Sequence, residues 1–339
     1  MIKEAIGSLV SGHSLTMQEA SSVMEEIMDG TATQAQMGAL MVALRLKGET
    51  PEEVAGFASV MRSRARQVCV SGPVIDIVGT GGDGQNTFNI STAAAFVIAG
   101  AGLKVAKHGN RAMSSRCGSA DVLEALGVKI DLTPEQVQAC VENVGIGFMF
   151  AQAFHPAMKF AATPRKEIGI RTVFNILGPL TNPAGAQYQV IGVPTEEIGY
   201  KIARALLHLH IRRALVVHGL NGIDELSISG KSAIWEVSEH DTEVSRHYIS
   251  PEELGLKSAP LDEVKGGTPL ENAAILHSIF KGEKTSRRDV VLLNAAAEIY
   301  VGGLAATLKE AVDLASQSID NSHAAEKLDR LVDFSSRLT

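Results

Sequence analysis

The sequence contains few cysteines and few aromatic residues. Its three cysteines, Cys69, Cys117 and Cys140, form no CxxC pair and have no metal-ligand spacing, and an odd number cannot complete a disulfide framework. With one Trp and four Tyr, the chain offers no aromatic platform for stacking single-stranded nucleic acid. A formal net charge of −7 also argues against general nucleic-acid binding. We therefore expect reduced thiols, no nucleic-acid partner and small ligands bound at a local basic site.

The sequence also lacks any uninterrupted apolar run of the length that a membrane helix needs. Its first residues, MIKEAIGSLVSGHSLT, contain neither a long apolar stretch nor a cleavage signal. Hydrophobic residues make up 45% and charged residues 20%, as in soluble globular proteins. A chain of 339 residues can form a large core and two domains. We expect a cytoplasmic protein with no membrane partner.

Residues 1 to about 68 are predicted to be helical throughout. Capping boxes begin helices at Thr16 and Thr33, and a proline in the first helical position follows Thr50. The helix predicted over 34–47 contains MGALMVAL and is apolar nearly all round. Such a helix either packs against a second copy of the protein or lies centrally in its own small bundle. The sequence leaves both interpretations open.

From Val74 onward, short β-branched runs alternate with helical stretches, which is typical of a mainly parallel sheet flanked by helices. Residues 155–180 are helical for longer than a simple crossover requires, 232–249 alternate as a β-hairpin does, and helices fill 269–338. The predicted fold class is α/β, with a small all-helical N-terminal lobe and a larger α/β domain. Strands are predicted at 74–78, 103–106, 128–131, 146–150, 188–193 and 214–218.

The stretch after the first predicted strand is rich in glycine, with four glycines between positions 79 and 84. Ser91 or Thr92 can then cap a helix over 93–101. A strand, a glycine loop and a helix N-terminus together present backbone N–H groups and the positive end of a helix dipole to an anion. The expected ligand is a phosphate.

Two common phosphate motifs fail at this loop. The dinucleotide fingerprint needs an acidic residue after the next strand, where Lys107 and His108 stand. The P-loop needs Lys and Ser or Thr where Gln85 and Asn86 stand. What remains is a site for several phosphates beside the carboxylate of Asp83, which indicates a metal-bound polyphosphate.

The segments GTGGD, NIST, KHGNRAMSS and GSADVLEALG, in this order and spacing, resemble those of the anthranilate phosphoribosyltransferase family. HPAMKFAATPRKEIGIRTVFNILGPLTNP (155–183) and VVHGLNGIDELS (216–227) agree, so the resemblance covers essentially the whole chain. It implies Mg²⁺-dependent transfer of the 5-phosphoribosyl group from phosphoribosyl pyrophosphate to the amine of anthranilate in tryptophan biosynthesis. The products would be N-(5-phosphoribosyl)anthranilate and pyrophosphate.

The resemblance also implies a domain division and an assembly. The helical lobe would comprise 1–68, rejoined by helices within about 165–183, and would close a cleft opposite the glycine loop. The phosphoribosyl pyrophosphate-binding α/β domain would comprise 73–164 and 186–339. The family's habit of dimerising through this lobe implies a homodimer.

Carried over residue by residue, the resemblance assigns three sets of site residues. For anthranilate they are Gly79, Asn110 and Arg165, where the planar guanidinium suits a carboxylate. For Mg²⁺ they are Ser91, Asp224 and Glu225. For phosphoribosyl pyrophosphate they are Gly79, Gly82, Asp83, Thr87, Asn89, Ile90, Ser91, Thr92, Lys107, His108, Gly109, Asn110, Arg111, Ala112, Met113, Ser114, Ser115 and Ser119.

The acidic pair Asp224 and Glu225 follows a predicted strand, at the end where open α/β sheets bind their ligands. Adjacent carboxylates repel each other, and a divalent cation offsets the repulsion. No residue is assigned as a general acid or base, because an arylamine is already a neutral nucleophile. His108 is more readily interpreted as shaping the aromatic pocket than as catalytic. A pyrimidine nucleoside phosphorylase of the same architecture is the alternative, although it has no need of the paired carboxylates.

Overall fold

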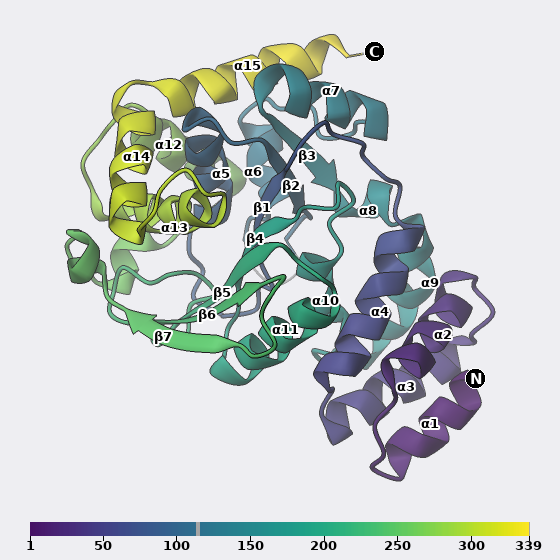
Figure 1. Ribbon diagram of the computed structural model, residues 1–339. Helices are drawn as coiled ribbons and strands as arrows, with labels where there is room; N and C mark the ends of the chain where they lie inside the picture. Colours follow the sequence, from purple (N-terminus) through teal and green to yellow (C-terminus); the bar gives the residue numbers. More distant parts are fainter. Residues whose placement is uncertain (113–115, 339) are drawn as a thin grey trace.

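The structure, a computed structural model, describes residues 1–112 and 116–338. A helical lobe stands at one end, next to a sheet covered by helices on both faces (Figure 1). Two hydrophobic clusters form the core. One lies between the sheet and the C-terminal helices, and the other runs from the opposite face of the sheet into the lobe.

The lobe begins with α1 (Ile2–Val10), α2 (Met17–Met28), α3 (Gln34–Lys47) and α4 (Pro51–Arg64). The predicted capping boxes are present at Thr16 and Thr33, and a third at Thr50 precedes the proline that starts α4. Helix α9 (Lys159–Ile168), from far along the chain, packs against α2 and α3. The first four helices therefore share their hydrophobic core with α9, which lies more than 90 residues later in the sequence.

Helix α3 packs against α1 and α9 inside the lobe. Its residues Met37, Leu40, Met41 and Leu44 are at most 2% exposed within this single chain. Leu46, on the other side of the helix, is 82% exposed. The lobe's own bundle thus accounts for most of the apolar character of α3, and only a narrow strip remains uncovered.

The sheet has seven strands in the order β3-β2-β1-β4-β5-β6-β7. The first five in this order pair in parallel, whereas the predicted hairpin, β6 with β7, joins the edge in antiparallel pairing. The mainly parallel sheet is confirmed. Its strands are β1 (Ile75–Gly79), β2 (Val105–Gly109), β3 (Ile146–Phe150), β4 (Tyr188–Gly192), β5 (Arg213–Gly219), β6 (Ser232–Ser238) and β7 (Ser245–Ile249).

The strand predicted at 128–131 is wrong. Val128 and Ile130 are buried, but they lie in the connection between α6 (Ser119–Ala125) and α7 (Pro134–Val144). The Lys129 backbone N–H donates to the Ser335 hydroxyl at 3.2 Å, so this segment rests on α15 (His323–Arg337) and pairs with no strand. Buried and exposed residues alternate in this segment because one of its sides packs against α15, and not because it is a strand in the sheet.

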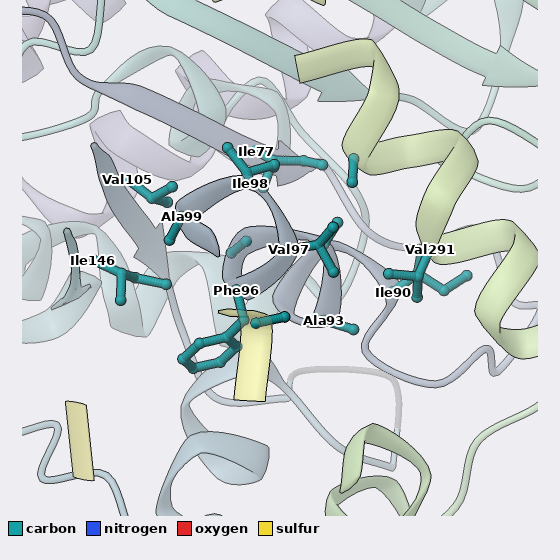
Figure 2. Packing of buried hydrophobic residues seen from close by; sticks show 14 of the residues in the cluster. Ile77, Ile90, Ala93, Phe96, Val97, Ile98, Ala99, Val105, Ile146 and Val291 are labelled. Carbon is teal, nitrogen blue, oxygen red and sulfur yellow. The ribbon is translucent and has the colours of Figure 1, made fainter. Parts of the chain in front are cut away.

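Alternate residues of the central strands face opposite layers. In β5, Leu215 and Val217 belong to the cluster under the C-terminal helices, while Ala214 and Val216 belong to the one shared with the lobe. Helix α5 (Ile90–Gly100) is buried between the sheet and α13 (Ser286–Val301). Figure 2 shows Ile98 beside Ile77 of β1 and Val97 on the side of Val291 of α13. The opposite face is covered by α11 (Glu196–His208), which also packs on α4.

The remaining elements connect these layers. Helix α5 starts at Ile90 after the N-cap Asn89, three residues before the predicted start, so Ser91 and Thr92 lie in its first turn and do not cap it. The predicted closing helices are α12 (Pro269–Phe280), α13, α14 (Leu308–Asp320) and α15. The segment 155–180 is divided into short helices: η1 (Pro156–Met158), α9, α10 (Phe174–Leu177) and η2 (Gly178–Leu180), with α8 (Ala151–Phe154) before them. No helix in the described part of the chain could span a membrane.

Candidate active site

The predicted phosphate-binding residues gather at the carboxyl edge of the parallel sheet. Gly79 ends β1 and Gly109 ends β2, and the acidic pair Asp224–Glu225 follows β5. Gly82 and Asp83 lie in the loop after β1, while Asn89, Ser91 and Thr92 lie at the start of α5. Parallel strands bring these segments to one edge, as the sequence predicts.

Asp224 fits tightly beneath the glycine loop. A Cβ atom added to Gly79 would lie 2.5 Å from Asp224 Oδ2, and one added to Gly192 would lie 1.7 Å from the Asp224 carbonyl oxygen. These two glycines are opposite each other in the pairing of β1 with β4. Asp224 Oδ2 also accepts a hydrogen bond from the Gly81 N–H at 2.7 Å. Close approach of Asp224 therefore requires glycine at both strand ends, and Gly192 was missed from the sequence.

The first turn of α5 meets the acidic pair. The Ser91 backbone N–H faces the carboxylate of Glu225 and opposes the rise in its pKa, and this negative charge lies at the positive end of the helix dipole. Asn89 does not cap the helix with its side chain; its Nδ2 donates to the Cys117 carbonyl at 3.2 Å. The Ile90 side chain is 1% exposed in the core, so only its backbone could reach a ligand. Thr92 is buried as well, and its hydroxyl has no partner among the described residues.

Lys107 joins three parts of the site. Its buried ammonium donates to the Ile77 carbonyl at 2.7 Å and to the Ser91 hydroxyl at 3.3 Å. Burial lowers the pKa of Lys107, while the nearby carboxylates of Asp76 and Glu225 oppose that shift. A positive charge thus lies directly behind the α5 terminus, where an anion would bind.

Asp83, Asp224 and Glu225 form a crowded acidic group. Burial, and then the charge of Asp83, raise the pKa of Asp224 to about 7. Burial and the charge of Asp224 raise the pKa of Glu225 well above its usual range. Asp83 Oδ2 is buried without a hydrogen-bond partner among the described residues. The repulsion among these three carboxylates and the unpaired Oδ2 of Asp83 fit a site for a divalent cation.

No group of three or more His, Cys, Asp or Glu side chains in residues 1–112 and 116–338 is arranged to hold a metal by itself. Mg²⁺ usually takes one or two carboxylates and completes its shell with phosphate oxygens and water. Asp224, Glu225 and the Ser91 hydroxyl therefore fit a shared site, in which a bound phosphate compound would supply part of the coordination.

The loop after β2 is folded back on α6. The Arg111 guanidinium pairs with Glu124 and with Asp121, the latter at 3.1 Å. The Ala112 N–H donates to Asp121 Oδ2 at 2.9 Å, and the Ser119 hydroxyl donates to the Asn110 carbonyl at 3.2 Å. Arg111 therefore has carboxylate partners of its own, and its contact with a phosphate stays a prediction. Met113, Ser114 and Ser115 lie outside the described residues.

Comparison with known proteins agrees with this geometry. The helical bundle domain of a glycosyl transferase family matches residues 3–65, and the a/b domain of that family matches residues 71–325. The chain is 62% identical to the anthranilate phosphoribosyltransferase of Dehalococcoides mccartyi (strain CBDB1), with 100% of this chain and 99% of that protein covered. The chain belongs to the anthranilate phosphoribosyltransferase family.

Other relatives place the same family on this fold. The anthranilate phosphoribosyltransferase of Chloroflexus aurantiacus (strain J-10-fl) is 56% identical, with 98% of each chain covered. The crystal structure of the Thermus thermophilus enzyme has a TM-score of 0.93 at 47% identity, covering 98% of this chain and 99% of that one. The Saccharomyces cerevisiae enzyme, in complex with PRPP and Mg, has a TM-score of 0.91 at 28% identity, covering 99% and 98%.

Two histidines, only one of them predicted, stand together in this member of the anthranilate phosphoribosyltransferase family. The rings of His108 and His155 are tilted, with centroids 5.1 Å apart, and both side chains are buried. Burial lowers the pKa of His108 to about 3 and that of His155 to about 4. The backbone at Gly178 and at Thr181 opposes these shifts in part, and both Nε2 atoms lack a hydrogen-bond partner in the described part of the chain. Both rings are neutral near pH 7.

Thr87 and Arg165 complete the predicted set. Thr87 forms an isolated β-bridge with Lys265, next to the glycine loop in sequence. Arg165, on α9, is half-buried and lies over the Phe174 ring at 5.7 Å from its centroid. Burial lowers the pKa of Arg165, and its guanidinium forms no ion pair with any described residue. It is therefore available for a carboxylate ligand.

Sequence reasoning missed His155, Gly192 and Arg171. His155 could have been found from its place as the first residue of the matched segment HPAM, and Gly192 from its position at a strand's end. Arg171 lies in the same matched segment (155–183), but nothing in its neighbouring residues indicates contact with the glycine loop. The structure nonetheless places its guanidinium against Gly82.

Proposed function

We propose that the protein transfers the 5-phosphoribosyl group from phosphoribosyl pyrophosphate to the amine of anthranilate, in a reaction that depends on Mg²⁺. The observation that carries the proposal is the meeting, at one sheet edge, of the α5 terminus, the buried Lys107 and the Asp224–Glu225 pair. A site of this kind combines donors for phosphate oxygens with carboxylates that favour a cation. The relatives' names supply the chemical identity of both substrates.

The phosphate side of the site stabilises a leaving group. Negative charge grows on pyrophosphate as its bond to the ribose C1 breaks, so donors fixed beforehand lower the barrier. Lys107 and the first turn of α5 are such donors, because the hydrogen bonds of Lys107 to the Ile77 carbonyl and to the Ser91 hydroxyl already hold them in place. Asp224, Glu225 and Ser91 would hold Mg²⁺, whose charge, when it is bound, offsets that of the pyrophosphate.

The anthranilate side needs no strong base, since the arylamine is neutral at pH 7. His108 and His155 are uncharged there and provide flat, buried surfaces. Arg165 can pair with the carboxylate through its planar guanidinium. Asn110 Oδ1 accepts hydrogen bonds from the Arg111 N–H at 2.8 Å and from Gln152 Nε2 at 3.4 Å, which orients this side chain beside the strand end. The reaction then rests on alignment of the two substrates.

We further propose a cytoplasmic homodimer formed through the helical lobe. Leu46 on α3 is 82% exposed and Val10 on α1 is 74% exposed, and α1 and α3 pack side by side. Large exposed side chains on adjacent helices suit a contact with a second copy. Light scattering on the purified protein tests the assembly, and a monomeric mass would contradict it.

The proposed reaction is tested by following the loss of anthranilate fluorescence. Loss that requires both phosphoribosyl pyrophosphate and Mg²⁺ is the expected result. Thymidine with phosphate serves as the control, because a pyrimidine nucleoside phosphorylase would cleave it. Turnover of thymidine without turnover of anthranilate would overturn the proposal.

A further inference from the structure

Arg171 contacts the glycine loop from the connection between α9 and α10. The backbone of this connection is fixed, since the Thr172 N–H donates to Asn175 Oδ1 at 2.8 Å. A Cβ atom added to Gly82 would lie 1.3 Å from Arg171 Nη1 and 2.4 Å from its Cζ. The guanidinium therefore occupies the space that any side chain at position 82 would need.

One end of this guanidinium lacks a partner. Arg171 Nη2 is buried, and no described residue accepts a hydrogen bond from it. A buried donor without an acceptor is unfavourable, and more so when it carries charge. An unpaired Nη2 this close to a phosphate-type loop is therefore expected to meet an acceptor that is not part of the protein.

Asp83, the residue after Gly82, has an acceptor atom that lacks a donor. Asp83 Oδ2 is also buried without a partner, yet Asp83 and Arg171 form no ion pair in the described structure. A cation and an anion thus flank Gly82 without satisfying each other. A ligand with both oxyanions and a bound cation would satisfy both groups, whereas a purely structural contact would have paired them directly.

We propose that Arg171 is a further residue that binds phosphoribosyl pyrophosphate, by donating from its guanidinium to a phosphate oxygen. This inference rests on the proposed function. A phosphate is favoured over the anthranilate carboxylate because Arg171 touches the glycine loop itself. The planar guanidinium can rest on the loop backbone through one face while its edge donates to the ligand, which a lysine could not do.

The competing explanation is that Arg171 only supports the loop. A support would affect stability and both substrates together, whereas a ligand-binding residue would affect one substrate. We therefore compare Arg171→Gln and Arg171→Lys with the parent, and use Lys166→Gln as the matched control. Lys166 is an exposed cation on α9, five positions away in sequence, so its loss reports the general effect of removing a positive charge.

The measurements are the KM of each substrate at saturating Mg²⁺, the calorimetric Kd of phosphoribosyl pyrophosphate without anthranilate, and thermal unfolding. Arg171→Gln should raise the KM and Kd for phosphoribosyl pyrophosphate by about ten- to a hundredfold, the range for a charged hydrogen bond. The KM for anthranilate should stay at the parent value. The KM and Kd of Arg171→Lys for phosphoribosyl pyrophosphate should lie between those of the parent and of Arg171→Gln. Lys166→Gln should have the values of the parent.

An unchanged Kd for phosphoribosyl pyrophosphate, or a rise confined to the KM for anthranilate, would overturn the inference. If Arg171→Gln does not fold, the Arg171→Ala variant with added guanidinium chloride replaces it, and rescue of the KM for phosphoribosyl pyrophosphate is then required. The proposed function fails separately, if the parent does not consume anthranilate. In that event the calorimetric comparison still decides whether Arg171 binds the phosphate compound.

Discussion

The Asp224 carboxylate holds the glycine loop, since its Oδ2 accepts a hydrogen bond from the Gly81 N–H at 2.7 Å across 143 positions of sequence. The carboxylate of the following residue, Glu225, faces the Ser91 N–H at the start of α5. Two neighbouring acids after β5 thus contact the two segments predicted to bind phosphate, the glycine loop and the start of α5. Under the proposed function their negative charges would hold a cation, while the acceptor oxygen of Asp224 also fixes the glycine loop.

The first prediction separates these two roles. Asp224→Asn with Glu225→Gln removes both charges but keeps an acceptor oxygen on each side chain. The double variant should need much more Mg²⁺ to reach its maximal rate, and its turnover should fall, because the leaving group loses electrostatic stabilisation. Binding of metal-free phosphoribosyl pyrophosphate should survive through Lys107 and the α5 terminus. The measurements are a Mg²⁺ titration of initial rates and calorimetry without metal.

Stability provides the control for this variant. Because burial raises the pKa of both acids, the ionised pair is unfavourable in the folded protein, so neutral replacements should not lower the free energy of unfolding at pH 7. A Mg²⁺ titration that overlays that of the parent would contradict a metal-binding role for Asp224 and Glu225.

The second prediction concerns Gly192, at the end of β4. In Gly192→Ala the added Cβ would lie 1.7 Å from the carbonyl oxygen of Asp224, a backbone atom that cannot turn aside. We expect a loss of about 1–3 kcal/mol in the free energy of unfolding, as for overpacking elsewhere, and a weaker response to Mg²⁺. Urea unfolding and the Mg²⁺ dependence of the rate measure the two effects.

Gly7→Ala is the matched control, because no heavy atom lies within 4 Å of the added Cβ on α1. Alanine is also the better helix former there, so this variant should be as stable as the parent or slightly more so. If Gly192→Ala were as harmless as Gly7→Ala, the close fit of Asp224 beneath the strand ends would be wrong.

The sequence could predict those features that depend on residues close together in the chain. Short β-branched runs and capping boxes reveal strands and helix starts, and parallel pairing then brings the strand ends that carry Gly79, Lys107 and Asp224 to one edge. The strand assigned to 128–131 failed because burial against α15 produces the same alternation as a sheet. Arg171 and Gly192 escaped because their partners, Gly82 and Asp224, are distant in sequence and are brought close only by the fold.

The third prediction is a pH dependence of stability caused by His108. Its pKa is about 3 in the folded protein, against a usual value near 6.5, because burial disfavours the charged ring. As the pH falls below about 6.5, the unfolded chain therefore binds a proton that the folded protein does not, so stability is lost with acidification. Between pH 7 and pH 5 this one group should lower the free energy of unfolding by about 2 kcal/mol.

His108→Asn tests that dependence, because the amide is polar like the neutral ring but does not titrate. The fall in unfolding free energy between pH 7 and pH 5 should be smaller in this variant by about 2 kcal/mol. His13→Asn, at an exposed position of the lobe, corrects for the replacement of a histidine. Parallel stability curves for parent and His108→Asn would rule out a buried neutral ring.

The last prediction assigns Arg165 to the anthranilate carboxylate. Its guanidinium is half-buried over Phe174 and forms no ion pair with the described residues, so truncation leaves no buried acid unpaired. Arg165→Ala should raise the KM for anthranilate by about one to two orders of magnitude, the equivalent of a charged hydrogen bond of roughly 1.5–3 kcal/mol. The KM for phosphoribosyl pyrophosphate should not change, because the glycine loop and Lys107 remain intact. Steady-state kinetics with each substrate varied in turn measures both constants, and Lys166→Ala on the exposed side of the same helix is the control. An unchanged KM for anthranilate would show that this guanidinium faces no substrate carboxylate.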